Sequence, residues 1–367
     1  MTRLTRDQVL KITISSRNRG ERLDLRGTDL RGTDLRNMDL SGAVLTGTKL
    51  SGAYLTGATL NRAKLSEVRL SGVKLSDAKL IGAKLNGADL SGADLSRVNL
   101  FAADLSGADL SGADLSGANL FGTDLSGTDL SGTNLTGAKL SGAFLNEATL
   151  NRAKLNDVKL KGAKLSKVNL FGAYLSGADL SRANLFGANL FEADLSSVDL
   201  SEADLRGADL TGADLSGAML NDAEMSGACL VDVTFTGAAL SNAKLIGAEL
   251  IGANLSGASL DKATATWADL TRAQLQQTSL RWADLKVANF QGANLKMANL
   301  EGADMQGANL RESNMRQANL KGANLRDADL LATDNLPGAR LQQAVYDGTT
   351  IWPDGFDPTL TGAISED

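Results

Sequence analysis

Histidine is absent from this 367-residue sequence, and cysteine occurs only once, as Cys229. Without histidine the chain cannot form a Ser-His-Asp or Cys-His catalytic arrangement, nor a histidine-ligated metal site. A single cysteine excludes a disulfide within the chain and favours a reducing, cytoplasmic setting. The sequence also lacks a GxxxxGK[ST] phosphate-binding loop. We therefore expect a protein that is not an enzyme, holds no metal and needs no cofactor.

Proline, aromatic residues and long apolar stretches are scarce as well. There are 3 prolines, and aromatic residues make up 4% of the chain. No apolar run approaches the ~20 residues that a membrane-spanning helix needs, and the start does not resemble a secretion signal. We expect no membrane span and no small-molecule substrate.

An unbroken five-residue period fills most of the chain. Every fifth residue from Leu25 to Leu330 is apolar, and Ala265 is the one small residue among these centres. The segment from Ser106 to Leu120, SGADLSGADLSGANL, shows the unit most plainly. Two residues before each centre stands a small side chain, nearly always alanine, otherwise mostly threonine, valine or serine.

A period of five fits neither an α-helix nor an ordinary β-strand, which repeat every 3.6 and 2 residues. A short period sustained over this length indicates a solenoid. The centre and the small residue are two positions apart, so one short extended segment can point both inward. We expect four such segments to close a twenty-residue coil, giving roughly 15 coils in an elongated stack. Leucine then fills the narrow core, and the 39 glycines suit tight corners.

The unit A-(D/N)-L-S-G resembles the consensus A(D/N)LXX of the pentapeptide repeat family. The resemblance implies an all-β solenoid, a right-handed quadrilateral β-helix with four pentapeptides per coil. It also implies protein partners, because many members that resemble this chain are cyanobacterial regulatory or assembly proteins. A linker in a large assembly, such as a light-harvesting antenna, would fit.

Three segments are predicted, at residues 1–22, 23–330 and 331–367. In the first segment, Thr5 and Gln8 form a capping box before a short helix around Asp7 to Ile12. This segment is either a lid over the open edge of the first coil or a docking element for a partner. Residues 23–330 form the pentapeptide coils.

The third segment departs from the five-residue period. Apolar residues shift by one position, to Leu336, Leu341, Tyr346 and Ile351. We expect an irregular last coil and a C-terminal cap in residues 331–367, with TGAISED as a tail. The aromatic side chains of Trp352 and Phe356 are expected to cover the last leucines. A dimer contact through the same rings is the alternative.

Charge alternates along the chain. Net charges are +5 over residues 41–85, −6 over 86–135, +5 over 136–170 and −9 over 171–260. Residues 46–70 recur at 136–160, so Tyr54 and Phe144 occupy equivalent positions. The offset of 90 residues is four and a half coils, which predicts that these two rings point in opposite directions. The duplication is either neutral or provides two similar partner surfaces.

Other aromatic residues are candidates for an interaction surface. Phe101 and Phe121 are twenty residues apart, as are Phe171 and Phe191, so each pair is expected to stack. These pairs either stabilise adjacent coils or form apolar contact patches. Near Ala265 we expect a pinch, bend or cavity, or else a binding notch roofed by Trp267 and Trp282.

Charged residues complete the candidates. Asp89, Asp109 and Asp129 should form a row, which we expect to be solvated rather than cation-binding. Lys154, Lys159 and Lys164 carry the second basic band. Few aromatics are interleaved with the lysines and the chain is net acidic, which argues against nucleic-acid binding.

Two functions follow from this pattern. The first is a non-enzymatic scaffold or linker that binds proteins through its charge-banded surface. The second comes from the resemblance, because some family members are thought to imitate duplex DNA and bind DNA gyrase. The predicted surface residues are Tyr54, Phe101, Phe121, Phe144, Lys154, Lys159, Lys164, Phe171, Phe191, Trp267 and Trp282.

Overall fold

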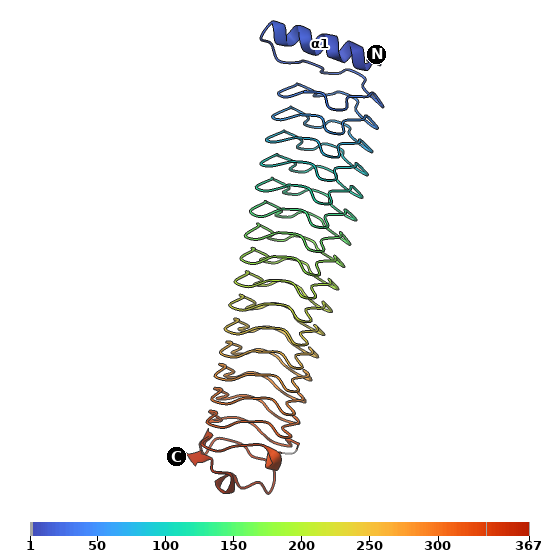
Figure 1. Cartoon of the computed structure of the whole chain (residues 1–367). Helices are drawn as coiled ribbons and strands as arrows, with labels where there is room; N and C mark the ends of the chain where they lie inside the picture. The colour runs from blue at the N-terminus through green and yellow to red at the C-terminus, as the bar shows by residue number, and fades with distance from the viewer. Residues whose placement is uncertain (1–2, 335, 367) are drawn as a thin grey trace. The chain divides into compact units, whose positions relative to one another are not determined.

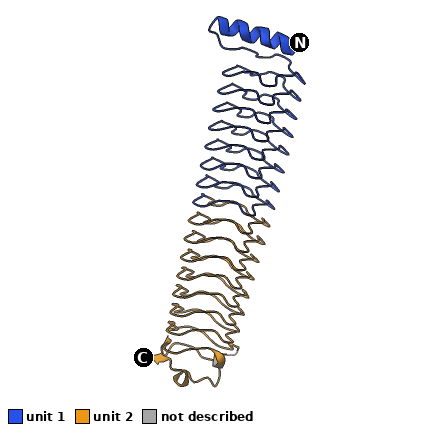
Figure 2. Cartoon of the chain, in the orientation of Figure 1, with its two compact units in different colours: residues 1–184 blue, residues 185–367 orange. Residues whose placement is uncertain are grey.

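The computed structural model describes residues 3–334 and 336–366 (Figure 1). The chain divides into two compact units, Met1–Asn184 and Leu185–Asp367 (Figure 2). Within each unit the chain winds into stacked coils, in which parallel bridges join residues twenty apart. Asp89 pairs with Asp109 in the first unit, and Asp269 pairs with Asn289 in the second. The predicted coil of four pentapeptides is therefore confirmed within each unit.

The corner of each pentapeptide is a tight turn. In the repeat centred on Leu110, the N–H of Ala113 donates to the carbonyl of Leu110 at 2.9 Å. The third residue of this turn, Gly112, has a φ of 64°. A positive φ at that position is typical of a type II turn and favours glycine, which has no Cβ to clash. The local geometry explains why Gly recurs with the five-residue period.

Backbone hydrogen bonds join one coil to the next. The N–H of Asp109 donates to the carbonyl of Ala88 at 2.9 Å, and the N–H of Leu110 donates to the carbonyl of Asp129 at 2.7 Å. At the corner, the N–H of Ser111 donates to Asp109 Oδ1 at 2.9 Å. The recurrent Asp or Asn thus supplies an acceptor for the corner N–H, as short polar side chains do in turns.

At a few corners where the residue before the centre cannot accept this bond, the preceding coil supplies the acceptor. Lys79 precedes the corner of Ile81, and the N–H of Ile81 donates instead to Asn61 Oδ1, twenty residues earlier, at 2.9 Å. Ser166 follows Lys164 and bonds in the same way to Asn146 at 3.1 Å. At these corners an Asn one coil earlier replaces the missing local acceptor.

The core consists of the centres and the small residues two positions before them. Phe235 and Phe290 are the largest fully buried side chains, and Ala265 is buried like the other centres. Threonine replaces alanine at some small positions without an unpaired hydroxyl, because Thr123 Oγ1 donates to the carbonyl of Leu100 at 2.9 Å.

The backbone differs from long β-strands. Among the described residues, strands longer than a single bridge occur only as β1 (Val345–Tyr346) and β2 (Ile364–Ser365). Turns recur every five residues, so each extended segment is too short for more than one bridge to its neighbour.

A helix precedes the first coil. Helix α1 (Arg6–Asn18) begins at the predicted capping box of Thr5 and Gln8. It is longer than the expected helix around Asp7 to Ile12, because Thr13 and Ser16 are buried and tertiary packing offsets their weak helix propensity.

The C-terminal residues lose the regular register in two steps. Bridges join Asn319 to Arg340 and Asp329 to Ile351, which are offsets of 21 and 22 residues. The predicted shift by one is confirmed, and Leu336 and Leu341 are buried. A second shift follows, so the prediction that Ile351 continues the apolar centres was wrong, and its side chain is exposed.

Short elements close this end. They are η1 (Leu336–Gly338), β1, η2 (Pro358–Thr361) and β2. Strand β2 pairs in parallel with β1, so the prediction of a free tail TGAISED was wrong for the described residues. Trp352 packs edge-on against Tyr346 at 5.4 Å and stacks on Phe356 at 5.3 Å between ring centroids. These rings bury one another at the end of the second unit.

Candidate interaction surface

Trp267 and Trp282 are the most exposed aromatic side chains among the large hydrophobic residues of the second unit. Their exposed fractions are 67% and 62%. Both occupy the corner position that glycine usually fills, with φ values of 57° and 58°. A left-handed backbone conformation costs a bulky residue roughly 1–2 kcal/mol. The two indole side chains are therefore largely exposed to solvent, at positions whose backbone conformation is unfavourable for a bulky residue.

The two tryptophans flank one side of the second unit. Trp282 lies at the corner before the segment of Asp284, and Trp267 lies at the corner after the segment of Thr264. Thr264 and Asp284 are joined by a bridge, so these segments stack on the same side. Val287, exposed as well, lies one coil after Trp267 in the same corner position. We call Thr264, Trp267, Trp282, Asp284, Lys286 and Val287 the tryptophan face.

Trp282 is held close to the backbone of the next coil. A Cβ added at Gly302 would lie 2.2 Å from the indole of Trp282, so the ring covers this glycine. Only glycine leaves room for the indole there. The ring is therefore positioned by the fold while most of its surface stays exposed.

The charged side chains between Trp267 and Trp282 pair with one another. Lys286 Nζ lies 3.1 Å from Asp284 and 3.0 Å from Asp304. Hydrogen bonds to Asp304 and Asp284, in that order, raise the pKa of Lys286. The surface between the two tryptophans therefore presents paired rather than free charges beside apolar side chains.

The surroundings of Ala265 keep the regular register. The N–H of Ala265 donates to the carbonyl of Asp284 at 2.7 Å, the same length as the equivalent bond of Leu245 to Thr264. The small centre therefore causes no break in the bonds between coils. The notch predicted beside it stays a prediction.

Tyr54 and Phe144 lie on opposite sides of the first unit. Tyr54 bridges Asp34 and Lys74, whereas Phe144 bridges Asp124 and Lys164. The two rings are half a coil apart in register, as the 90-residue offset predicts. Both are exposed, by 49% and 46%.

Phe101 and Phe121 stack as predicted, with ring centroids 5.7 Å apart and an interplanar angle of 4°. Phe171 belongs to the first unit and Phe191 to the second, so their stacking stays a prediction. The guanidinium of Arg152 lies 5.8 Å from the ring centroid of Phe171.

The second lysine band does not gather on one side. Lys154, Lys159 and Lys164 lie on three successive segments of one coil. Their bridges run to Asn134, Lys139 and Phe144 in the preceding coil. A partner on one side of the unit would meet only part of this band.

The aspartate row is confirmed as a row, because Asp89 bridges Asp109 and Asp109 bridges Asp129. Each of these carboxylates accepts the N–H of the serine two residues later. Within residues 3–334 and 336–366, no group of three or more histidine, cysteine, aspartate or glutamate side chains is arranged to hold a metal ion.

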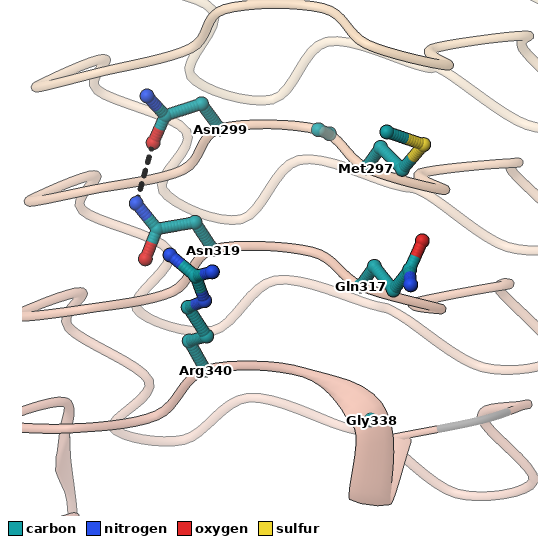
Figure 3. A pocket seen from close by; sticks show the side chains of 7 residues that line it. Met297, Asn299, Gln317, Asn319, Gly338 and Arg340 are labelled. Carbon is teal, nitrogen blue, oxygen red and sulfur yellow. Dashed lines mark hydrogen bonds between the residues drawn. The ribbon is translucent and has the colours of Figure 1, made fainter.

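A surface cavity of about 610 Å³ lies near the C-terminal register shift (Figure 3). Its lining includes Met297, Asn299, Asn319 and Arg340. Asn319 Nδ2 donates to Asn299 Oδ1 at 2.9 Å. Sequence reasoning missed this cavity, because the extra residue in the last coil changes the register and the five-residue pattern does not show what space that leaves.

Sequence reasoning also missed Val287, Met297 and Ile81 as exposed apolar residues. Val287 and Ile81 could have been found by writing the sequence in rows of twenty, which places Val287 beneath Trp267 and Ile81 above Phe101.

The family model for pentapeptide repeats matches in successive segments that together cover residues 24–334. This chain belongs to the pentapeptide repeat family. Membership implies a right-handed β-helix, and the match indicates no catalytic family.

Several solved pentapeptide repeat structures are similar to the chain. HetL, a protein involved in heterocyst differentiation regulation from the cyanobacterium Nostoc sp. strain PCC 7120, is 28% identical, with 87% of this chain and 96% of that chain covered and a TM-score of 0.23. Another pentapeptide repeat protein from Nostoc PCC 7120 is 35% identical over 28% of this chain and 84% of that chain, with a TM-score of 0.28.

QnrB1, a plasmid-mediated fluoroquinolone resistance protein, is 18% identical over 60% of this chain and 87% of that chain, with a TM-score of 0.39. No curated protein matches the chain. Across the described residues, no helix is long and apolar enough to span a membrane.

Proposed function

We propose that this pentapeptide repeat protein is a non-enzymatic scaffold or linker that binds another protein through the tryptophan face. The observation that carries the proposal is the pair of large, exposed apolar side chains, Trp267 and Trp282. The same left-handed corner holds polar residues such as Lys262 and Arg272 nearby, so exposed apolar area rather than backbone conformation distinguishes the two tryptophans. Tryptophan is also strongly enriched among the residues that dominate protein–protein binding energies.

The surrounding chemistry supports a protein partner. Lys286, Asp284 and Asp304 form an internal ion-pair cluster, so the face offers no free charge cluster for a nucleic acid. Val287 extends the apolar edge beside Trp267. A partner with its own apolar side chains would gain from covering both edges.

The test uses glycine variants, because glycine fits the left-handed corner. Gly247 and Gly307 occupy the same corner position as Trp267, with φ values of 61° and 68°. We expect Trp267→Gly and Trp282→Gly to leave the melting temperature unchanged or raise the stability by up to about 1 kcal/mol.

Affinity capture from the native cell, followed by mass spectrometry, should then show proteins retained by the wild type and lost by both variants. Leu360→Ser, which changes another highly exposed apolar residue, is the matched control and should retain them. If the tryptophan variants capture the same proteins as the wild type, the proposal is wrong.

DNA mimicry toward gyrase remains the rival, and it rests on the family resemblance. A duplex mimic needs a continuous acidic surface, whereas basic residues occur on all sides of the first unit. Lys49, Lys64, Lys74 and Lys79, between residues 46 and 80, each lie on a different one of the four sides of the coils. Such a basic collar would repel an enzyme's own DNA-binding groups.

A further inference from the structure

Charge in the first unit is sorted by side as well as along the chain. One side, between residues 59 and 162, carries no carboxylate at its outward strand positions or at the corner that follows them. We call this side the lysine face. Its members are Thr59, Arg62, Lys79, Ile81, Asn99, Phe101, Asn119, Phe121, Lys139, Lys159 and Lys161.

Parallel bridges hold the strand positions of this face in one line. They join Thr59 to Lys79, Lys79 to Asn99, Asn99 to Asn119, and so on to Lys139 and Lys159. Asn119 Nδ2 also donates to Asn99 Oδ1 at 3.3 Å, which fixes the two central amides. Asp39 and Asp179 lie one coil beyond the two ends of the face.

The corner beside this line is apolar at its centre. Ile81, Phe101 and Phe121 occupy the same corner position in three successive coils, and all three are exposed. The phenylalanine rings stack on each other, so they present their edges outward. The result is a ridge that suits aliphatic and aromatic packing from a partner.

Lysines stand on either side of the ridge. Lys79, Lys139 and Lys159 are exposed, and none has an ion-pair partner among the described residues. From Lys79 to Lys139 is three coils, or about 14 Å at the ~4.8 Å spacing of neighbouring strands. The surface is therefore basic, then apolar, then basic along the stacking direction.

The neighbouring sides have the opposite charge at the level of the ridge. Asp94 and Asp114 lie on one of them, and Asp104 and Asp124 lie on the other. These carboxylates would repel a continuous phosphate backbone, since they lie within a Debye length of it. The mutual stacking of the two phenylalanines also covers one face of each ring, which leaves less aromatic surface on which successive bases could stack.

We propose that the lysine face is a docking surface for an acidic protein segment with an apolar centre. The apolar centre packs on Phe101 and Phe121, and carboxylates on both sides of it pair with Lys79 at one end and with Lys139 and Lys159 at the other. The inference rests on the proposed scaffold role, but it uses a different surface from the tryptophan face.

The test uses the full-length protein and a fluorescein-labelled synthetic peptide with three glutamates at each end and Leu-Phe-Leu-Leu between them. Fluorescence anisotropy should show binding that weakens as salt is raised. Lys139→Asn with Lys159→Asn should weaken binding about fivefold at low salt. Phe101→Ser with Phe121→Ser should weaken it roughly tenfold or more, and serine already occupies this corner position at Ser141.

The matched control lies on the opposite side of the same unit. Lys49 and Arg69 are also a bridged basic pair, so Lys49→Asn with Arg69→Asn removes the same charge. This variant should bind the peptide within about twofold of the wild type. A peptide with lysines in place of the glutamates should not bind, and melting temperatures should confirm that every variant is folded.

Four results would overturn the inference. They are no binding of the glutamate peptide to the wild type, equal binding of the glutamate and lysine peptides, equal weakening in the control variant, or tighter binding of a short single-stranded DNA oligonucleotide that the same lysine and phenylalanine variants abolish. Trp267→Gly should leave peptide binding unchanged. Loss of peptide binding alone, with tryptophan-dependent capture intact, would contradict this inference and leave the proposed function standing.

Discussion

Leu110 illustrates what each centre contributes at the residue scale. Its side chain is fully buried, and its N–H donates to the next coil. Burying a leucine contributes ~1.5–3 kcal/mol, and coils in a solenoid are stabilised mainly by their nearest neighbours.

We predict that Leu110→Asp destabilises several adjacent coils, because a buried carboxylate without a partner adds to the lost burial. Leu110→Ala should cost ~2–5 kcal/mol and leaves no buried charge. Thermal unfolding followed by circular dichroism measures both. An unchanged melting temperature in the aspartate variant would contradict the inward position of the centres.

Arginine–aspartate pairs at the start of the first unit are a second feature at this scale. Arg26 donates to Asp24, Arg31 to Asp29 and Arg36 to Asp34, each two residues earlier in the chain. The side-chain hydrogen bond from Arg26 is the largest cause that lowers the pKa of Asp24 from 3.8 to about 2. Similar bonds lower the pKa values of Asp29 and Asp34.

A depressed pKa in the folded state predicts a loss of stability in acid. The contribution of Asp24 is fully present above its unfolded pKa of 3.8 and is lost as the pH falls through the folded value of about 2. NMR titration of the Asp24 carboxyl should show this low midpoint, and Arg26→Gln should move it toward 3.8. Arg22→Gln changes a nearby arginine that forms no ion pair with Asp24, so this variant should leave the titration midpoint of Asp24 unchanged.

Helix α1 shows how a terminal element closes a solenoid. Carbonyls of the first coil have no preceding coil to bond to. Leu4 N–H donates to the carbonyl of Asp29 at 2.9 Å, and Arg17 Nη2 donates to that of Asp39 at 3.0 Å. Arg6 donates to the carbonyl of Asp34 at 3.2 Å. These bonds favour the interpretation of residues 1–22 as a lid over the first coil rather than as a docking element for a partner.

We predict that Arg6→Gln with Arg17→Gln increases amide hydrogen exchange in α1 and in the first coil. Without these two donors to the carbonyls of Asp34 and Asp39, the helix should detach more often and expose the amides of the first coil to solvent. Exchange around Leu110 should stay unchanged, because the effect is local. Arg19→Gln is the control, since Arg19 pairs only with Glu21 within the same terminal segment. Equal exchange in the double variant and the wild type would refute the lid.

The sequence predicts much of these elements, because the period of five directly reports which residues point inward. It predicts the inward leucines, the capping box at Thr5 and the stack of Phe101 on Phe121. It did not predict that β2 pairs with β1, because that pairing depends on a second register shift that no repeated residue marks. The lysine face was missed since linear windows average Lys79 with residues on other sides of the coil.

At the scale of the whole molecule, net charge is −6 and the sign alternates along the sequence. A DNA mimic requires negative potential that continues over the enzyme's binding surface. Lysine at several sides of the coils interrupts that potential.

We therefore predict no inhibition of gyrase supercoiling at low micromolar concentration. The variant Lys154→Glu, Lys159→Glu and Lys164→Glu makes the second basic band acidic on three sides of one coil. In a supercoiling assay this variant should also be inactive, and its binding of the glutamate peptide at the lysine face should weaken most at low salt. Inhibition that strengthens in the triple variant would favour the mimic over the scaffold.

The central claim is that outward side chains form interaction surfaces because residues twenty apart lie side by side. Disulfide cross-linking tests this most directly. In a Cys229→Ser background, Lys139→Cys with Lys159→Cys places two thiols on bridged positions, whereas Lys139→Cys with Lys154→Cys places them on different sides. Bridged neighbours about 5 Å apart fall within the range of Cα separations for disulfides. Mild oxidation followed by mass spectrometry should show an intramolecular disulfide between positions 139 and 159 and none between 139 and 154, and the reverse result would contradict the account.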